Sequence, residues 1–152
     1  MDRFAGQGRG GFTLVELVVV IMILGIIATI AVPRLLSTSS TAVDNGLKQS
    51  LGVIRDAIAA FAAQRGALPG ADGSQATFKS DLASYLRGVN FPSCPVAAEN
   101  DAVRMQSGTG SVTPGIAATA ATHSWVYKYE TGDFYINSTD TTADGTTTYD
   151  QF

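Results

Sequence analysis

The sequence of 152 residues contains one cysteine, one histidine and one tryptophan, and only 15% of its residues are charged. The lone cysteine, Cys94, excludes an intrachain disulfide, and we expect its thiol to be buried. With His123 as the single histidine, the chain has no cluster of His and Cys at metal-ligand spacing. The net charge of −3 provides no basic stripe for phosphate contacts, so no nucleic-acid partner is expected.

The most prominent feature of the sequence is one long apolar run, from Phe12 to Val32, which contains a single acid, Glu16. As a helix it would be about 30 Å long, which matches the hydrocarbon core of a bilayer. Arg3 and Arg9 precede the run. Under the positive-inside rule this flank predicts an N-terminus in the cytoplasm and the rest of the chain across the inner membrane.

Three interpretations of the apolar run compete. A secretory signal peptide would be cut after the run, with Ala31 at a tolerable small-residue site. An acid inside such a run costs about 2.5–3.5 kcal/mol at the centre of a membrane helix, and somewhat less near its end. A plain signal anchor leaves Glu16 unexplained. The third interpretation uses this acid together with the glycines before it.

The stretch Gly11-Phe12-Thr13-Leu14-Val15-Glu16 resembles the prepilin processing site of type IV pilins and of type II secretion pseudopilins. The resemblance covers roughly residues 1–65. It implies that a peptidase on the cytoplasmic face cuts after Gly11 and methylates Phe12, the new N-terminal residue. Glu16 falls where the family keeps its glutamate.

The resemblance continues through Gly25 and Pro33, which bracket a stretch of helix that can loosen in type IV pilin filaments. It also gives Glu16 a physical role. Cleavage creates a positive amine on Phe12, and a carboxylate four residues on can meet the amine of an adjacent subunit. Because lone charges in a low dielectric are costly, this pairing would select the stagger of subunits in a filament.

Beyond Pro33 the sequence still predicts a helix, so that one nearly continuous helix would run from Phe12 to Arg65 and stop at Gly66. Apolar residues recur at intervals of three and four on one face: Val43, Leu47, Leu51, Ile54, Ile58 and Phe61. We place Asp44, Lys48 and Arg55 on the opposite, solvated side. Residues 37–41 are all Ser or Thr and favour either a linker or a pliable section of helix.

The remainder predicts a small head. Residues 75–86 have helical spacing, whereas residues 107–122 are rich in Gly, Ser, Thr and Ala and predict a loop. A β-hairpin is expected over 124–137, with Trp125, Tyr127 and Tyr129 on one face against the helix. The predicted fold class is α+β and pilin-like: a long N-terminal helix, apolar and then amphipathic, with a small C-terminal antiparallel sheet.

The last residues, 138–152, are acidic and rich in threonine, and we expect a solvated, frayed tail. Major pseudopilins often bind calcium in a C-terminal loop, and Asp140, Asp144 and Asp150 offer the hard oxygen ligands that calcium prefers. Their spacing is not that of an EF-hand. Calcium is therefore a weak candidate, and no other cofactor is expected.

The predicted organisation is a leader peptide (1–11), an apolar membrane and filament-core half of the helix (12–33), an amphipathic half (34–65), a head (66–137) and the tail (138–152). The head offers no nucleophile, base and orienting group in combination, so an enzyme is not expected. The family resemblance implies a structural subunit of a type IV pilus-like filament. Because Cys94 is alone, a pilin-type disulfide-bounded C-terminal loop is impossible. This departure and the modest head favour a pseudopilin or a minor filament subunit over an adhesive pilin, and a type II secretion pseudopilin is the leading interpretation.

The alternatives are a subunit of a type IV pilus or DNA-uptake filament, minor pilins included, and a membrane-tethered domain that binds ligands at the cell surface. The partners that the resemblance implies are prepilin peptidase, copies of the chain and related subunits, and an inner-membrane platform with a cytoplasmic ATPase. The lipid bilayer would hold the chain before assembly. The expected location is the inner membrane and then a periplasmic or cell-surface filament.

Overall fold

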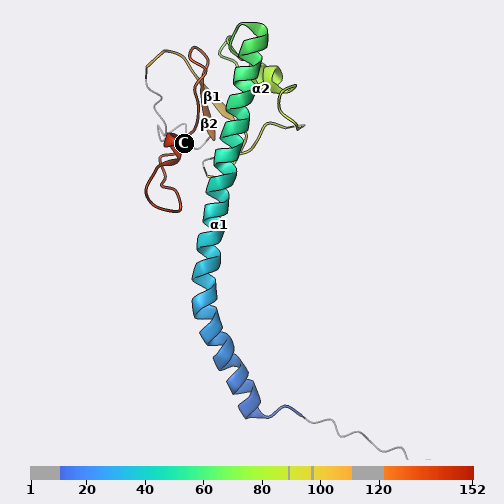
Figure 1. Ribbon diagram of the computed structural model, residues 1–152, viewed down its shortest axis with the longest axis vertical. Helices are drawn as coiled ribbons and strands as arrows, with labels where there is room; N and C mark the ends of the chain where they lie inside the picture. The colour runs from blue at the N-terminus through green and yellow to red at the C-terminus, as the bar shows by residue number, and fades with distance from the viewer. Residues whose placement is uncertain (1–10, 89, 97, 111–121) are drawn as a thin grey trace, which may run out of the picture. The chain divides into compact units, whose positions relative to one another are not determined.

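The computed structural model describes residues 11–88, 90–96, 98–110 and 122–152 (Figure 1). Its elements are α1 (Leu14–Arg65), α2 (Gln75–Leu82), β1 (Val103–Gln106), β2 (Trp125–Lys128), β3 (Phe134–Ile136) and a 3-10 helix, η1 (Tyr149–Gln151). The chain divides into two compact units, Met1–Thr38 and Ser39–Phe152, and α1 contributes to both. The predicted leader, apart from Gly11, and most of the predicted 107–122 loop lie outside the described residues.

Helix α1 confirms the predicted long helix. It continues past Pro33 and through residues 37–41. These Ser and Thr residues are therefore a section of helix and not a non-helical linker. The hydroxyl of Thr38 donates to the carbonyl oxygen of Arg34, 2.8 Å away, so this polar side chain is satisfied by the helix itself. The helix ends as predicted at Gly66, whose φ of 69° is left-handed and whose N–H donates to Ala62 O at 2.8 Å.

In the first unit, the large apolar side chains described in α1 are exposed on all sides of the helix, by between 47% at Val18 and 79% at Leu14. A helix that is apolar on every side needs either lipid or other protein around it. By length and composition, α1 is the helix in the described part of the chain that could cross a membrane.

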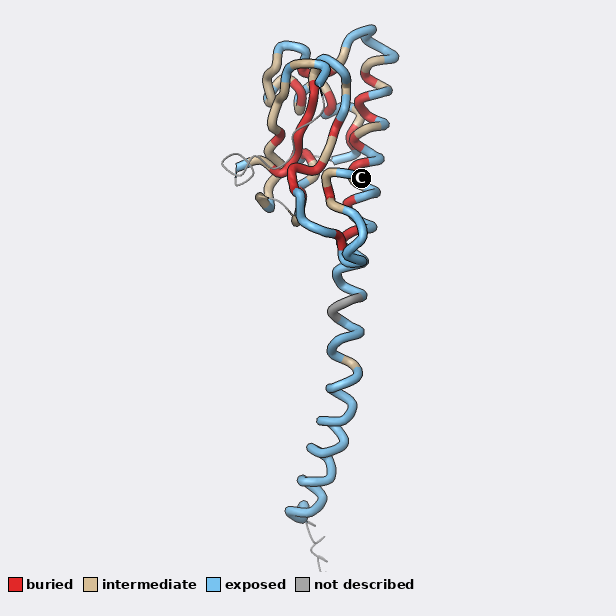
Figure 2. The backbone as a smooth tube through the Cα atoms, turned by 90° about the vertical axis from the view of Figure 1, so that its left-hand side faces the viewer, coloured by how far each residue is buried: buried red, intermediate tan, exposed pale blue. Residues whose placement is uncertain are grey.

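In the second unit, one face of α1 carries the head. Leu47, Leu51 and Ile54 are at most 2% exposed, and the buried stripe continues to Phe61 (Figure 2). The predicted face is therefore confirmed, except that Val43 is 36% exposed. Asp44, predicted on the solvated side, is instead buried at 7% exposure. Its burial has a structural cause in the C-terminal residues, described below.

The sheet has the order β1-β2-β3. Strands β2 and β3 are antiparallel, with Trp125 opposite Ile136 and Tyr127 opposite Phe134, which confirms the hairpin. Strand β1 is parallel to β2, with Val103 opposite Trp125. The predicted α+β, pilin-like fold class is therefore confirmed, with the correction that the sheet is mixed and not antiparallel throughout. Parallel strands are joined by a long crossover and not by a tight turn, so the sequence has no local turn signal that would predict this pairing.

Aromatic rings fill the space between α1, α2 and the sheet. The centroids of Phe78 and Tyr127 are 4.2 Å apart, and those of Trp125 and Phe134 are 5.3 Å apart. All four side chains are at most 1% exposed. Tyr129, predicted on the same face, is only partly buried. The stripe of rings therefore forms the core of the head.

Helix α2 ends at Leu82 and not at Leu86 as predicted. At the end of α2 the chain tightens, because the N–H groups of Ala83 and Tyr85 donate to carbonyl oxygens three residues earlier, Ser80 O at 3.3 Å and Leu82 O at 3.0 Å. The hydroxyl of Tyr85 donates to Gln64 Oε1 at 2.7 Å, and its ring meets Phe61 edge-on. These contacts hold Tyr85 against α1 in the segment that follows α2.

The turn before α2 allows a direct test of packing. Gly70 has a φ of 62°, and a Cβ atom there would lie 2.7 Å from Phe78 Cβ. Gly70→Ala should therefore destabilise the head by about 2–5 kcal/mol, from left-handed backbone strain and overpacking together. Urea unfolding followed by Trp125 fluorescence measures the change.

Gly66→Ala is the matched control, because its φ of 69° is similar and nothing lies within 4 Å of the added Cβ. It should show only the strain, about 1–2 kcal/mol. Equal losses for the two variants would contradict the close approach of Gly70 to α2.

The C-terminal residues are ordered by their own hydrogen bonds, so the prediction of a frayed tail was wrong. Thr142 N–H donates to Thr147 O at 2.9 Å, and Thr141 pairs with Thr148 as an isolated bridge. Tyr149 is 8% exposed. Threonine and aspartate side chains complete the turn by bonding nearby backbone groups, which composition alone does not distinguish from a solvated tail.

Candidate processing and assembly site

The predicted cleavage bond lies immediately before α1. Gly11, Phe12 and Thr13 are not helical, and α1 begins at Leu14. Phe12 is 85% exposed, and nothing lies within 4 Å of a Cβ built at Gly11. An exposed, non-helical bond is the kind that a peptidase can reach.

Glu16 caps the start of α1. Its Oε2 accepts hydrogen bonds from Thr13 N–H at 2.9 Å and from the Thr13 hydroxyl at 3.0 Å, while Thr13 Oγ1 accepts from Glu16 N–H at 3.2 Å. This reciprocal arrangement is a capping box, which satisfies backbone donors that a helix start leaves free. The signal was present as Thr-x-x-Glu before an apolar run, and sequence reasoning missed it.

The capping box gives Glu16 a local role besides the predicted pairing with an amine. The two roles are compatible in position, because Phe12 precedes the capping residue Thr13 directly. In the unprocessed chain Phe12 N belongs to a peptide bond, so the pairing of Glu16 with a terminal amine stays a prediction.

Gly25 and Pro33, the residues predicted to loosen the helix, both lie inside α1. The carbonyl oxygen of Gly25 accepts a hydrogen bond from the Thr29 hydroxyl at 3.0 Å. The chain is helical at both positions, although Pro33 has no backbone N–H to donate, and their role in a stretched filament stays a prediction.

Two of the three calcium candidates, Asp140 and Asp144, have local hydrogen-bond partners for their carboxylates. Asp140 Oδ2 accepts from the Ser138 hydroxyl at 3.0 Å, and Asp144 Oδ1 accepts from the Thr142 hydroxyl and from Thr146 N–H. The bonds from Thr142 and Thr146 lower the pKa of Asp144 to about 2.

Asp150 has one buried carboxylate oxygen, Oδ1, without a hydrogen-bond partner. Across the described residues, no group of three or more His, Cys, Asp or Glu side chains could hold a metal ion. The three aspartates are thus not brought together as a ligand set, and calcium binding stays a prediction.

Cys94 is buried at 1% exposure, as predicted.

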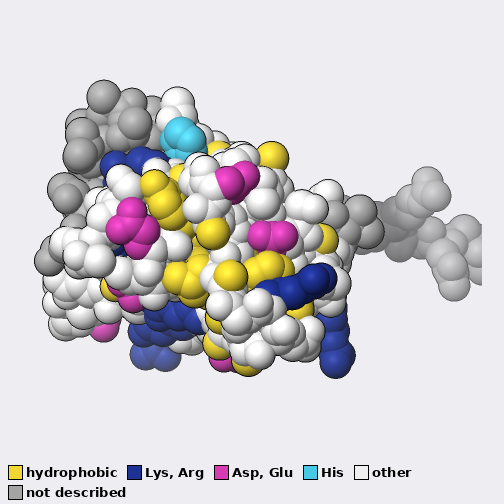
Figure 3. Space-filling view, turned by 90° about the horizontal axis from the view of Figure 1, so that it is seen from above, with side chains coloured by type: hydrophobic (Ala, Val, Ile, Leu, Met, Phe, Trp, Pro, Cys, Tyr) yellow, Lys and Arg dark blue, Asp and Glu magenta, His cyan; other side chains and the backbone are white. Residues whose placement is uncertain are grey.

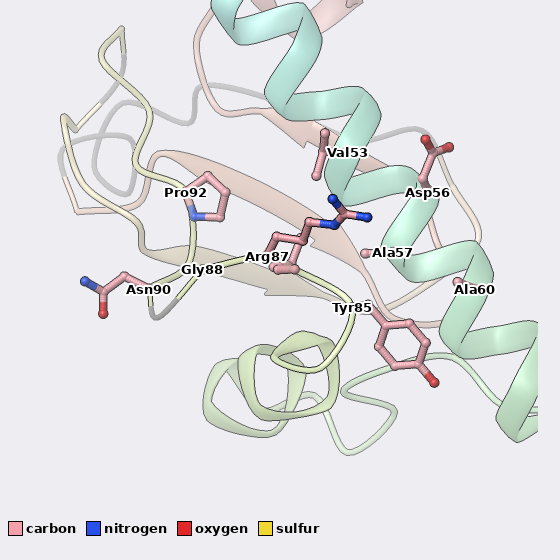
Figure 4. Close-up of a pocket in the computed structure, with 10 residues that line it drawn as sticks. Val53, Asp56, Ala57, Ala60, Tyr85, Arg87, Gly88, Asn90 and Pro92 are labelled. Carbon is pink, nitrogen blue, oxygen red and sulfur yellow. The ribbon is translucent and has the colours of Figure 1, made fainter.

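The head also has a groove of about 630 Å³ between α1 and the segment after α2 (Figure 4). Val53, Ala57 and Ala60 form its α1 wall. Arg87 extends from the opposite segment toward α1, and Asp56 projects from the helix. The groove is mainly apolar, with one charge of each sign at its edge.

The surface of the head seen in Figure 3 carries Asp and Glu side chains and Lys and Arg side chains interspersed with hydrophobic ones. Within the described part of the head, Lys79 and Asp101 form an ion pair at 2.8 Å. This face has no field of one sign that would steer a highly charged ligand from a distance.

Residues 7–32 match the family model described as the prokaryotic N-terminal methylation motif. The matched segment includes the Gly11–Phe12 bond, the capping box and the whole apolar run from Phe12 to Val32. No curated protein and no solved structure matches the chain. The chain therefore carries the prokaryotic N-terminal methylation motif of prepilin-type proteins, consistent with a type IV pilin-like protein or pseudopilin.

Proposed function

We propose that the chain is a structural subunit of a type IV pilus-like filament, and specifically a pseudopilin of a type II secretion system. The observation that carries the proposal is the methylation motif joined to a helix whose apolar side chains are exposed on all sides. Such a surface requires lipid before assembly and neighbouring helices after it. The head, with its own core, would remain outside the packed helices.

In this proposal, prepilin peptidase cuts after Gly11 on the cytoplasmic side and methylates Phe12. The subunit waits in the inner membrane with its head outside. An inner-membrane platform, driven by a cytoplasmic ATPase, then adds it to copies of itself and related subunits. Glu16 guides each addition by meeting the amine of a neighbouring Phe12, because both charges would otherwise be buried alone.

Intact mass spectrometry of the protein from membranes of its native host tests the processing step. The expected mass lacks residues 1–11 and includes one added methyl group. A chain that still begins at Met1 contradicts the proposal. A freely soluble chain that begins after Ala31 would instead indicate an ordinary signal peptide.

Deletion of the gene in its host distinguishes the filament systems. Loss of protein secretion, with surface pili intact, is expected for a pseudopilin. Loss of surface pili or of DNA uptake, with secretion intact, would instead assign the chain to a type IV pilus or DNA-uptake filament. The absence of a disulfide-bounded loop favours the first outcome.

A second candidate function is a membrane-tethered domain that binds a ligand at the cell surface. The groove beside α1 favours it, because concave and mainly apolar surfaces with a few polar groups are typical of ligand sites. A deletion strain that expresses Arg87→Ala and secretes normally, but loses a surface-binding phenotype, would support this function over the filament role alone.

A further inference from the structure

Residues 138–152, which we call the C-terminal clasp, contact α1 at several side chains, of which the acid Asp44 accepts two hydrogen bonds. The hydroxyl of Tyr149 donates to Asp44 Oδ1 at 2.7 Å, and the N–H of Ala143 donates to Asp44 Oδ2 at 2.9 Å. Both oxygens of this carboxylate are thereby occupied by the clasp. The two bonds join residues that are 105 and 99 positions apart in the sequence.

Asp44 depends on these bonds because it is only 7% exposed. A desolvated carboxylate without partners is strongly unfavourable, so removing the donors would expose or destabilise this turn of helix. Burial, followed by the hydrogen bond and charge of Asp44, raises the pKa of Tyr149 to about 12. The phenol therefore keeps its proton at neutral pH and remains a donor.

Two further contacts hold the end of the clasp one to three helical turns beyond Asp44. Arg55 Nη2 donates to the main-chain oxygen of Phe152 at 2.6 Å and to that of Phe134 at 2.8 Å. The ammonium of Lys48 lies 4.4 Å from the centroid of the Phe152 ring. Lys48 is exposed, as predicted, and contacts the clasp through its ammonium group, whereas Arg55, predicted as solvated, is partly buried and hydrogen-bonded to the clasp.

The position of Asp44 on α1 is the informative point. Among the side chains described in α1, Asp44 is the first that is buried, and residues 38–43 before it are exposed. Immediately N-terminal to it lie the Ser and Thr residues of 37–41, which have poor helix propensity. Pro33 removes one more backbone bond there. Asp44 therefore lies at the boundary between the part of α1 whose side chains are exposed and the part that packs against the head.

We infer that the C-terminal clasp is a stop that limits the loss of helical structure in α1 at Asp44. The side chains described over residues 33–43 are all exposed, so this stretch can unwind with the core of the head in place. Unwinding past Asp44 must first break the two hydrogen bonds to the clasp. The inference concerns the head and its own helix, so it does not depend on the proposed filament.

Hydrogen–deuterium exchange on the full chain in detergent micelles, followed by mass spectrometry of peptides from α1, tests this stop. Asp44→Ala and Tyr149→Phe each remove one side of the same bond. Both should speed exchange in peptides covering residues 44–50 by about tenfold or more, the factor that loss of a buried charged hydrogen bond implies. Peptides covering residues 54–62, which Ile54 and Phe61 anchor in the core, should be unchanged.

Asp56→Ala is the matched control, since Asp56 is an exposed acid on the same helix. It should leave exchange at residues 44–50 as in the wild type. Unchanged exchange in Tyr149→Phe, or an equal increase across the whole head, would overturn the inference. If Trp125 fluorescence shows that Asp44→Ala does not fold, Tyr149→Phe alone decides between the outcomes, because it removes one hydroxyl and keeps the ring.

Discussion

Replacing Glu16 with alanine is expected to leave membrane insertion intact and to reduce the amount of protein in filaments by about a hundredfold. The estimate follows from the cost of one unpaired charge in an apolar surrounding, about 2.5–3.5 kcal/mol. In the proposed pairing, the alanine variant would leave the amine of each neighbouring Phe12 without a carboxylate. The measurement is the ratio of sheared or sedimented filaments to membrane-bound subunit, by immunoblot. Normal assembly of Glu16→Ala would contradict the role of Glu16.

Two matched variants separate the charge of Glu16 from its place in the capping box. Glu16→Gln keeps an acceptor for Thr13 N–H but loses the charge, so it should assemble as poorly as alanine. Thr13→Ala keeps the charge and loses the hydroxyl of the box, at a cost of about 0.5–2 kcal/mol in helix stability. It should assemble far better than Glu16→Gln. The reverse order would mean that capping, and not charge pairing, explains the acid.

The second large effect is expected in the core of the head. Phe134→Ala should lower the free energy of unfolding by about 3–5 kcal/mol, because it empties a site surrounded by other rings. Phe134 is 1% exposed, and its ring centroid lies within 6.3 Å of those of Phe78, Phe91, Trp125 and Tyr127. A loss of this size is a large part of the stability of a small domain, about 5–15 kcal/mol.

Trp125, the single tryptophan of the chain, reports the unfolding of this cluster by its fluorescence in urea. Phe134→Leu is the control, because it keeps an apolar side chain in the site and should cost about 1–2 kcal/mol. A midpoint for Phe134→Ala equal to that of the wild type would show that the ring cluster does not hold the head together.

The sequence predicts best where a pattern is local and periodic. The helix from Leu14 to Arg65 follows from a continuous apolar run and a stripe of apolar residues three and four apart. The hairpin of β2 and β3 follows from alternating side chains around a turn at Gly132, which has a φ of 83°. The processing motif is also local, and the family match at residues 7–32 agrees with it.

The missed features depend on contacts between distant residues. From its position relative to the apolar face of α1, Asp44 is predicted to be solvated. It is a buried hydrogen-bond acceptor because the distant clasp covers it. Strand β1 has only four residues, and its parallel partner β2 follows after a long crossover. The capping box is an exception, because Thr13 and Glu16 are close in sequence. In the sequence analysis, Glu16 is explained by its pairing with an amine, and helix capping, which is the simpler role, is not considered.

The long sequence separation between Asp44 and the clasp has a consequence for biosynthesis. At a ribosome speed of roughly 5–20 residues per second, Tyr149 is added about 5–20 s after Asp44. During that interval the nascent helix lacks both hydrogen-bond donors for this carboxylate. The attachment of the clasp to α1 therefore cannot form before Tyr149 has been added, and until then the carboxylate of Asp44 is hydrated by water instead.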